Sequence, residues 1–131
     1  MRGKKGSISV YVVDDDEAVR DSLAVLLELE GFLVKVFPTP VEFLNAMEMC
    51  YIRHSDPKCL LLDLHMPGKG GHELLEQVIA RKFRIPVVVM TGNADKNSRD
   101  RAMKSGAVAF LEKPVDADIL IETIKIAQHR I

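Results

Sequence analysis

Residues 59–63 read Cys-Leu-Leu-Leu-Asp, a short apolar run that ends in a carboxylate. A strand that is apolar at every position is typical of the interior of a parallel sheet, where helices cover both faces. The same pattern recurs at residues 10–13 and 87–90, which are followed by Asp14 and Thr91. These stretches predict buried parallel strands, each with a polar side chain just beyond its last apolar residue.

Longer segments with the spacing of amphipathic helices lie between the apolar runs. The expected strands are residues 8–13, 33–37, 59–62, 86–90 and 107–111, and the expected helices are residues 17–30, 40–52, 70–82, 95–104 and 116–130. We expect Asp16 and Asp116 to begin the first and last helices, and Gly31 to end the first. This alternation of strands and helices predicts an α/β fold with a parallel sheet.

The composition is that of an ordinary globular protein whose core needs no metal or disulfide. The chain has 131 residues, so we expect one domain at residues 7–131, preceded by a disordered lead-in at residues 1–6. The formal net charge of −1 gives no general attraction to nucleic acid or to an anionic membrane. We therefore expect no direct nucleic-acid binding by this chain.

The sequence shows neither a membrane span nor a disulfide framework. No apolar run approaches the roughly 20 residues that cross a bilayer. The two cysteines, Cys50 and Cys59, lack the paired spacing of a zinc site or a disulfide. A reducing, cytoplasmic location fits this pattern best, and we expect no membrane association.

Polar residues follow four of the expected strands, at the edge of a parallel sheet where ligands bind. They are Asp14 and Asp15, Asp63, Thr91 and Lys113. Neighbouring carboxylates repel each other, and a cation that prefers oxygen ligands, Mg²⁺ or Mn²⁺, relieves the repulsion. A lysine and a hydroxyl suit a phosphoryl group, and a carboxylate can be its acceptor. Each residue alone could be a helix cap, a turn residue or a surface residue, but their joint placement predicts a phosphoryl-transfer site.

Several motifs of this chain together resemble the response-regulator receiver domains of bacterial two-component systems, the CheY-like superfamily. They are Val-Val-Asp-Asp-Asp-Glu at 12–17, Leu-Asp-Leu-His-Met-Pro-Gly at 62–68, Met-Thr-Gly at 90–92, Lys-Ser-Gly-Ala at 104–107 and Phe-Leu-Glu-Lys-Pro at 110–114. The resemblance covers about residues 7–130, and the sequences of these motifs are most similar to those of the FixJ-like branch. The resemblance implies a flavodoxin-like (βα)5 doubly wound sheet with strand order 2-1-3-4-5.

The resemblance also implies a role for each residue near the site. Asp63 would accept a phosphoryl group from a sensor histidine kinase or a phosphotransfer protein. Asp14, Asp15, Asp63 and the backbone carbonyl of His65 would hold Mg²⁺. The remaining roles are the following: Thr91 and Lys113 would bind the phosphoryl oxygens, Phe110 would turn inward when Thr91 moves, His65 and Asn93 would flank the attacking water, and Pro114 would follow a cis peptide bond.

Two other functions use part of the same residue set. A haloacid-dehalogenase-like phosphatase would use Asp14, Asp16, Thr91 and Lys113, but it needs a later acidic pair that is missing and leaves Asp63 idle. A phosphate-independent adaptor would use the fold for binding alone. We expect neither, and we expect no enzyme in the usual sense, because the phosphoacceptor would assist only its own phosphorylation and dephosphorylation.

The last two helices differ in apolar content. Only Ala102 and Met103 are apparent core residues of 95–104, so we expect that helix to be short or mobile before phosphorylation. In the last helix, Ile119 and Ile126 lie outside the apolar stripe that is expected to face the sheet. Either the core-facing side of this helix is wide, or the two isoleucines form an exposed apolar patch used for pairing. The resemblance implies a homodimer through residues 95–131 when phosphorylated, and control of a transcriptional output domain or a partner. An excised and a stand-alone receiver both remain open.

Overall fold

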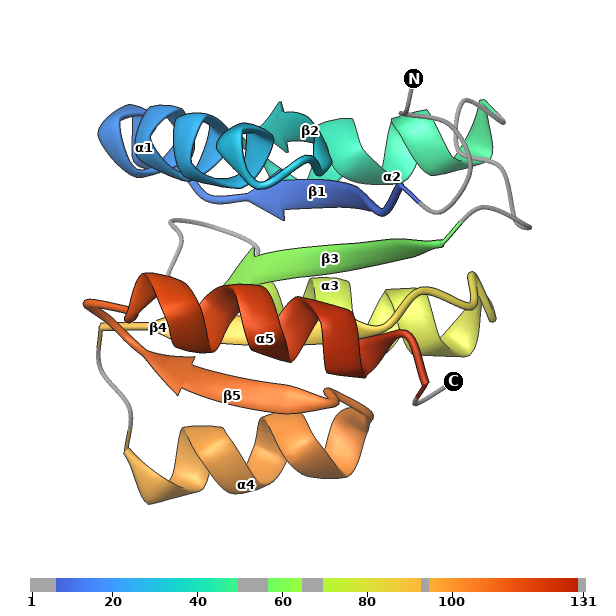
Figure 1. Ribbon diagram of the computed structural model, residues 1–131. Coiled ribbons are helices and arrows are strands. Elements are labelled where there is room, and N and C mark those ends of the chain that lie inside the picture. Colours follow the sequence, from blue (N-terminus) through green and yellow to red (C-terminus); the bar gives the residue numbers. More distant parts are fainter. Residues whose placement is uncertain (1–6, 50–56, 65–69, 93–94, 130–131) are drawn as a thin grey trace.

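The computed structural model describes residues 7–49, 57–64, 70–92 and 95–129, and these form a five-stranded parallel sheet flanked by helices (Figure 1). The strand order is β2-β1-β3-β4-β5, as the resemblance implies. The strands are β1 (Ser9–Val13), β2 (Leu33–Phe37), β3 (Lys58–Asp63), β4 (Val87–Thr91) and β5 (Ala109–Glu112). The helices are α1 (Glu17–Leu29), α2 (Pro40–Glu48), α3 (Gly71–Ala80), α4 (Lys96–Ser105) and α5 (Ala117–Ala127). The predicted α/β fold is confirmed.

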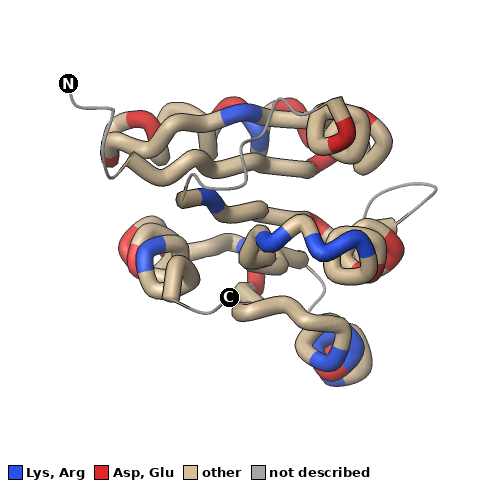
Figure 2. Tube along the Cα trace, turned by 90° about the vertical axis from the view of Figure 1, so that its right-hand side faces the viewer, with Lys and Arg blue, Asp and Glu red and all other residues tan. Residues whose placement is uncertain are grey.

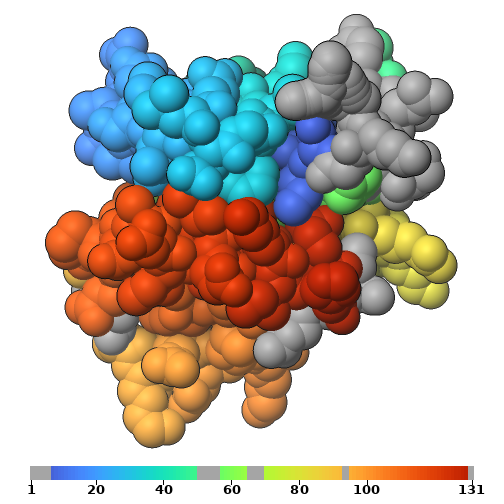
Figure 3. Space-filling model, in the orientation of Figure 1, coloured from blue at the N-terminus to red at the C-terminus, as the bar shows by residue number. Residues whose placement is uncertain are grey.

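Two hydrophobic clusters lie on opposite faces of the sheet. One joins the sheet to α2, α3 and α4 through Phe43, Leu74 and Ala102. The other joins it to α1 and α5 through Leu27 and Ile124, and Figure 3 shows α5 filling the surface between α1 and α4. β3 has all its residues buried, because helices cover both of its faces.

Parallel pairing aligns the ends of the strands at one edge of the sheet. Val13 pairs with Leu62, Asp63 pairs with Met90, and Thr91 pairs with Glu112. The residues that follow β1 and β5 therefore lie beside the last residues of β3 and β4. This alignment brings together side chains that are far apart in the sequence.

The ends of most predicted elements differ from the observed ones by one or two residues. β3 and β4 extend to include their polar residues Asp63 and Thr91. β5 begins two residues later than predicted, because Ala107 still closes the end of α4, where its N–H donates to the Ala102 carbonyl at 3.1 Å. α2 ends at Glu48, four residues before the predicted end at 52, and residues 50–56 lie outside the described residues. The predicted lead-in, residues 1–6, lies outside them too.

Local signals for helix ends and for burial are confirmed at several positions. Asp16 and Asp116 are N-caps that accept main-chain N–H bonds, and Gly31 has a φ of +95°, which glycine adopts without steric cost. Cys59 is a free cysteine in the core, where burial raises the pKa of its thiol to about 12. Within the described part of the chain, no helix is both long enough and apolar enough to pass through a bilayer.

Candidate functional site

Asp63 closes β3 with only 5% of its surface exposed. Its position depends on Gly71, the first residue of α3, whose N–H donates to the Leu64 carbonyl at 3.2 Å. A Cβ on Gly71 would lie 2.5 Å from the Asp63 carbonyl oxygen and 2.6 Å from Leu64 Cα, closer than real Cβ atoms approach backbone. A glycine is therefore required for α3 to start against the end of β3.

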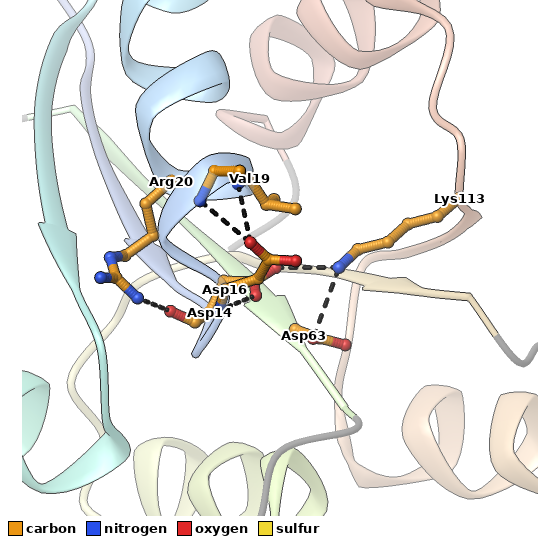
Figure 4. Close-up of polar contacts among 7 residues, drawn as sticks. Asp14, Asp16, Val19, Arg20, Asp63 and Lys113 are labelled. Carbon is orange, nitrogen blue, oxygen red and sulfur yellow. Dashed lines mark hydrogen bonds and ion pairs between the residues drawn. The ribbon is translucent and has the colours of Figure 1, made fainter.

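Asp14, the first residue after β1, is fully buried, and four groups bind it. Its N–H donates to the Phe37 carbonyl at 3.2 Å. Its carboxylate accepts from Asp16 N–H at 2.9 Å and from Lys113 Nζ at 2.9 Å. Its own carbonyl accepts from Arg20 Nη1 at 2.7 Å. Figure 4 shows Arg20 and Lys113 reaching Asp14 from opposite sides. A buried carboxylate needs this pairing, because removing its charge from water is costly.

Lys113 links the two buried carboxylates. Its Nζ lies 2.9 Å from Asp14 Oδ2 and 3.4 Å from Asp63 Oδ2 (Figure 4). Burial alone would lower the pKa of Lys113, but the hydrogen bond to Asp14 and the charges of Asp63 and Asp14 outweigh it, so the pKa lies above its ordinary value. The lysine is therefore a fixed cation beside Asp63.

The carboxylates of Asp14, Asp15 and Asp63 form a cluster that fits a divalent cation. Each offers one oxygen, and these oxygens lie within 4.8 Å of one another. Asp15 is exposed, whereas its two neighbours are buried. An all-oxygen donor set suits Mg²⁺ or Mn²⁺ rather than zinc, and Mg²⁺ typically keeps several waters and leaves room for phosphate oxygens. Asp16 instead caps α1 by accepting from Ala18 N–H at 2.9 Å, as predicted.

The other predicted site residues lie around this cluster where the structure describes them. Thr91 is fully buried at the end of β4, and its carbonyl accepts from Lys113 N–H at 2.8 Å. Phe110 is half-buried, contacts the core, and borders a hollow of about 500 Å³ between α4 and β5. The peptide bond between Lys113 and Pro114 is cis, as the resemblance implied. His65 and Asn93 lie outside the described residues.

Reasoning from the sequence missed two residues that shape the site. Arg20 was overlooked because a charged residue early in a helix usually faces solvent. Gly71 carried a usable signal, since Gly-Gly at 70–71 precedes an apolar helical pattern and paired glycines often mark a close backbone approach. Arg20 offered no comparable signal, because its partner is a main-chain atom six residues away.

Known proteins with similar sequences support the resemblance to receiver domains independently of the site geometry. Residues 10–125 match the family model described as the response regulator receiver domain. The transcriptional regulatory protein FixJ of Azorhizobium caulinodans is 41% identical over 124 residues, which cover 95% of this chain and 56% of that protein. FixJ of Bradyrhizobium diazoefficiens is 42% identical over 118 residues, covering 90% and 55%. The chain thus spans little more than half the length of these relatives.

Solved structures agree with the sequence relatives. The crystal structure of FixJ-N aligns with a TM-score of 0.86 at 38% identity, covering 97% of this chain and 98% of that one. Full-length FixJ from B. japonicum aligns with a TM-score of 0.80 at 41% identity, covering 91% of this chain and 56% of that one. The chain therefore belongs to the family of response regulator receiver domains, the phosphate-accepting modules of two-component signalling.

Proposed function

We propose that Asp63 is the phosphoacceptor of this receiver and that its donor is the phosphohistidine of a sensor histidine kinase or a phosphotransfer protein. The observation that carries the proposal is the lysine between two buried carboxylates, with Lys113 Nζ 2.9 Å from Asp14 and 3.4 Å from Asp63. Structural ion pairs are common, but this one lies at the strand-end edge where ligands of parallel sheets bind. An exposed third carboxylate, Asp15, stands beside it.

The chemistry is an in-line transfer to a carboxylate. An Asp63 oxygen forms a bond to phosphorus while the phosphorus–nitrogen bond of the donor breaks, and the donor's imidazole leaves. Lys113 and the Thr91 hydroxyl would bind the phosphoryl oxygens. Fixed positive charge and hydrogen-bond donors are the main requirements of phosphoryl transfer, because charge spreads over the oxygens of the transferred group.

The carboxylates of Asp14, Asp15 and Asp63 would hold Mg²⁺, or Mn²⁺ in its place, with the His65 carbonyl as a further ligand by analogy with the family. When bound, the cation would neutralise charge on the phosphoryl oxygens. Asp14 and Asp63 already share Lys113 as a counter-charge. Asp15 is exposed, so its carboxylate would bind the cation from the solvent side of the cluster.

Phosphorylation would bias a two-state equilibrium of the domain. Moving such an equilibrium from 1:99 to 99:1 takes about 5.5 kcal/mol of differential stabilisation, which new contacts of phosphoryl oxygens with Thr91 and Lys113 would supply. Phe110 would turn inward as Thr91 moves. The altered surface of residues 95–131 would pair two copies of the chain or contact a transcriptional output domain.

His65 and Asn93 would flank the attacking water that hydrolyses the aspartyl-phosphate, and Pro114 would hold the backbone after Lys113. The domain would thus assist its own phosphorylation and dephosphorylation without acting on a separate substrate. A cytoplasmic location belongs to the same proposal, and the buried free thiol of Cys59 is compatible with it.

A phosphatase that uses Asp14 as nucleophile is less compatible with the geometry. Both oxygens of that carboxylate are engaged, one by Asp16 N–H and the other by Lys113. The residue is also fully buried. A nucleophile must present a free oxygen to phosphorus, and neither oxygen of Asp14 meets this requirement.

The test is phosphorylation of Asp63→Asn with acetyl phosphate and Mg²⁺, measured by intact mass. We expect the wild type to gain one phosphoryl group and Asp63→Asn to gain none. Asp118→Asn, an exposed aspartate of α5, is the matched control and should be labelled like the wild type. Labelling of Asp63→Asn to the same extent as the wild type would disprove the proposal. A wild type that gains no phosphoryl group, and whose NMR spectrum does not change when beryllofluoride is added, would favour a phosphate-independent adaptor.

A further inference from the structure

The main-chain carbonyl of Asp14 is bound by a side chain that has no part in the proposed transfer. Arg20, a half-buried residue of α1, donates from Nη1 to this oxygen at 2.7 Å (Figure 4). A guanidinium stays charged throughout the pH range in which proteins fold. Hydrogen bonds from charged donors are roughly twice as strong as neutral ones. The contact is therefore a strong constraint on the turn between β1 and α1.

Arg20 holds this turn at two points. Its side chain bonds the Asp14 carbonyl, and its own N–H donates to the Asp16 carbonyl at 3.0 Å. The N–H of Asp16 in turn donates to Asp14 Oδ1 at 2.9 Å. The peptide group before Asp15 is thus held by Arg20, and the peptide group after it is held by Asp14. Together these bonds fix the backbone direction from which the Asp15 side chain leaves.

Asp15 depends on this backbone constraint more than its neighbours do. Asp14 is fixed by Lys113, but among the described residues the exposed Asp15 carboxylate has no hydrogen bond or ion pair. Its oxygen nevertheless lies within 4.8 Å of oxygens of Asp14 and Asp63. Like charges at this separation repel one another. A turn that was free to rotate would carry Asp15 away from the other two carboxylates.

We infer that Arg20 is a positioning residue for divalent-cation binding, which acts by holding the peptide between Asp14 and Asp15 so that the Asp15 carboxylate faces the cluster. This inference rests on the proposed function, because it concerns the same acidic cluster. Arg20 is not itself a ligand, since it is a cation that contacts only the main chain of the pair. Its effect is comparable to that of the outer groups that orient ligands in metal sites.

The experiment measures the affinity of the folded chain for Mn²⁺ by electron paramagnetic resonance of the free ion, without any phosphate donor. Arg20→Gln should weaken Mn²⁺ binding about tenfold or more, the usual loss when a group that orients a ligand is removed. Arg20→Lys keeps the charge but not the planar donor geometry, so its affinity should lie between those of Arg20→Gln and the wild type.

Arg81→Gln is the matched control. It also removes one arginine charge, but Arg81 lies at the C-terminal end of α3, away from the acidic cluster, where it pairs with Glu48 of α2. It should bind Mn²⁺ like the wild type. The amide NMR shifts of Asp15 and Asp16 in the metal-free protein should move in Arg20→Gln and not in Arg81→Gln. A merely structural arginine would lower stability and move these shifts locally, but it would leave the Mn²⁺ affinity in place.

Arg20→Gln that binds Mn²⁺ within about twofold of the wild type would overturn the inference, since oriented ligands are worth more than that. If Arg20→Gln does not fold, an Arg20→Lys variant with wild-type affinity overturns it equally. The proposed function fails separately, when the wild type binds Mn²⁺ but Asp63 takes up no phosphoryl group. A wild type that binds no Mn²⁺ would refute both.

Discussion

Helices α4 and α5 follow neighbouring strands at the site, and they differ in how many apolar side chains they bury. α4 comes after Thr91, and α5 comes after Lys113. α5 buries Leu120, Ile121, Ile124 and Ala127 against the sheet, whereas α4 buries only Ala102. Figure 2 shows Lys and Arg gathered on α4 at the bottom of the view. One helix is held by its core contacts, and the other lies on the domain with little apolar contact.

This difference separates two roles within one fold. Elements with few buried apolar contacts open most easily, and the parts of proteins that move in switching come from this group. α5 packs against the sheet in which Asp63 ends β3 and Lys113 directly follows β5. α4 adjoins the hollow lined by Phe110, and under the proposed function a change at Thr91 would move α4 with little loss of global stability.

The largest expected effect concerns core truncation in the two helices. Ile124→Ala on α5 removes a fully buried side chain and should lower the free energy of unfolding by about 2–5 kcal/mol. Met103→Ala on α4 shortens a side chain that is 41% exposed and should cost less than about 1 kcal/mol. Urea denaturation of both variants measures the contrast. Equal losses would show that α4 contributes to the core as much as α5 does.

Hydrogen exchange should show the same contrast in the wild type. We expect the amides of α4 to exchange through local opening, at a free energy well below that of global unfolding, while α5 and β3 exchange only with global unfolding. Saturation with beryllofluoride and Mg²⁺ should slow exchange in α4 most. Amides in α4 that already exchange as slowly as those in β3 would remove the basis of the comparison.

Each helix begins with an aspartate cap, which permits a matched test of smaller size. Asp95 accepts from Ser98 N–H at 2.8 Å, and Asp116 accepts from Ile119 N–H at 3.1 Å. Losing such a cap typically costs about 1 kcal/mol. Asp116→Ala should lose this amount in global unfolding. Asp95→Ala should lose less, because a helix that opens locally cannot contribute more to global stability than its own opening costs.

In Asp95→Ala the lost cap should instead lower the free energy of local opening of α4. The result is faster hydrogen exchange confined to α4, measured at the same pH and temperature as in the wild type. Asp116→Ala should raise exchange throughout the domain instead. If the two variants lower the midpoint of urea unfolding by the same amount, the two helices are equally coupled to the core.

The sequence predicted the sheet and the acidic cluster because both follow from local patterns. An apolar run followed by a polar residue places that residue at the end of a buried strand, and parallel pairing then brings the ends together. Asp14, Asp63 and Lys113 lie together for this reason. The contact of Arg20 depends on the path of the backbone in a turn, which no residue pattern determines, whereas the Gly-Gly pair at 70–71 did signal the close approach at Gly71.

Positions on helix surfaces were predicted less well. Met103 was expected in the core and is exposed, because Ala102 occupies the inward position and the next residue is turned by about 100°. α4 was expected to be short or mobile. It has ten residues, as many as α3, so it is not short, and its mobility stays a prediction. Ile121 widens the core face of α5, while Ile119 and Ile126 are 56% and 48% exposed. That exposure favours the pairing patch, whose role stays a prediction.

The smallest expected effect is in the surface charges of α4. Lys96 Nζ lies 2.9 Å from Asp100 Oδ2 one helical turn away, and this hydrogen bond, with the lysine charge, holds the pKa of Asp100 below its ordinary value. A depressed pKa means that the pair stabilises the helix above the ordinary carboxyl pKa and that this contribution is lost as pH falls through the folded-state pKa. Lys96→Gln should return the pKa of Asp100 toward its ordinary value.

Carboxyl NMR titration of Asp100 in the wild type and in Lys96→Gln measures that return. Urea midpoints of the two proteins should coincide near neutral pH, because exposed ion pairs contribute little to stability. The described residues of α5 form no such pair, so this pKa shift is specific to α4. As the pH falls further, we expect faster exchange in α4 while α5 stays protected, because α4 buries only Ala102 and α5 buries four apolar side chains. Loss of protection in both helices at the same pH would mean that they unfold together, and that α4 is no more independent of the core than α5.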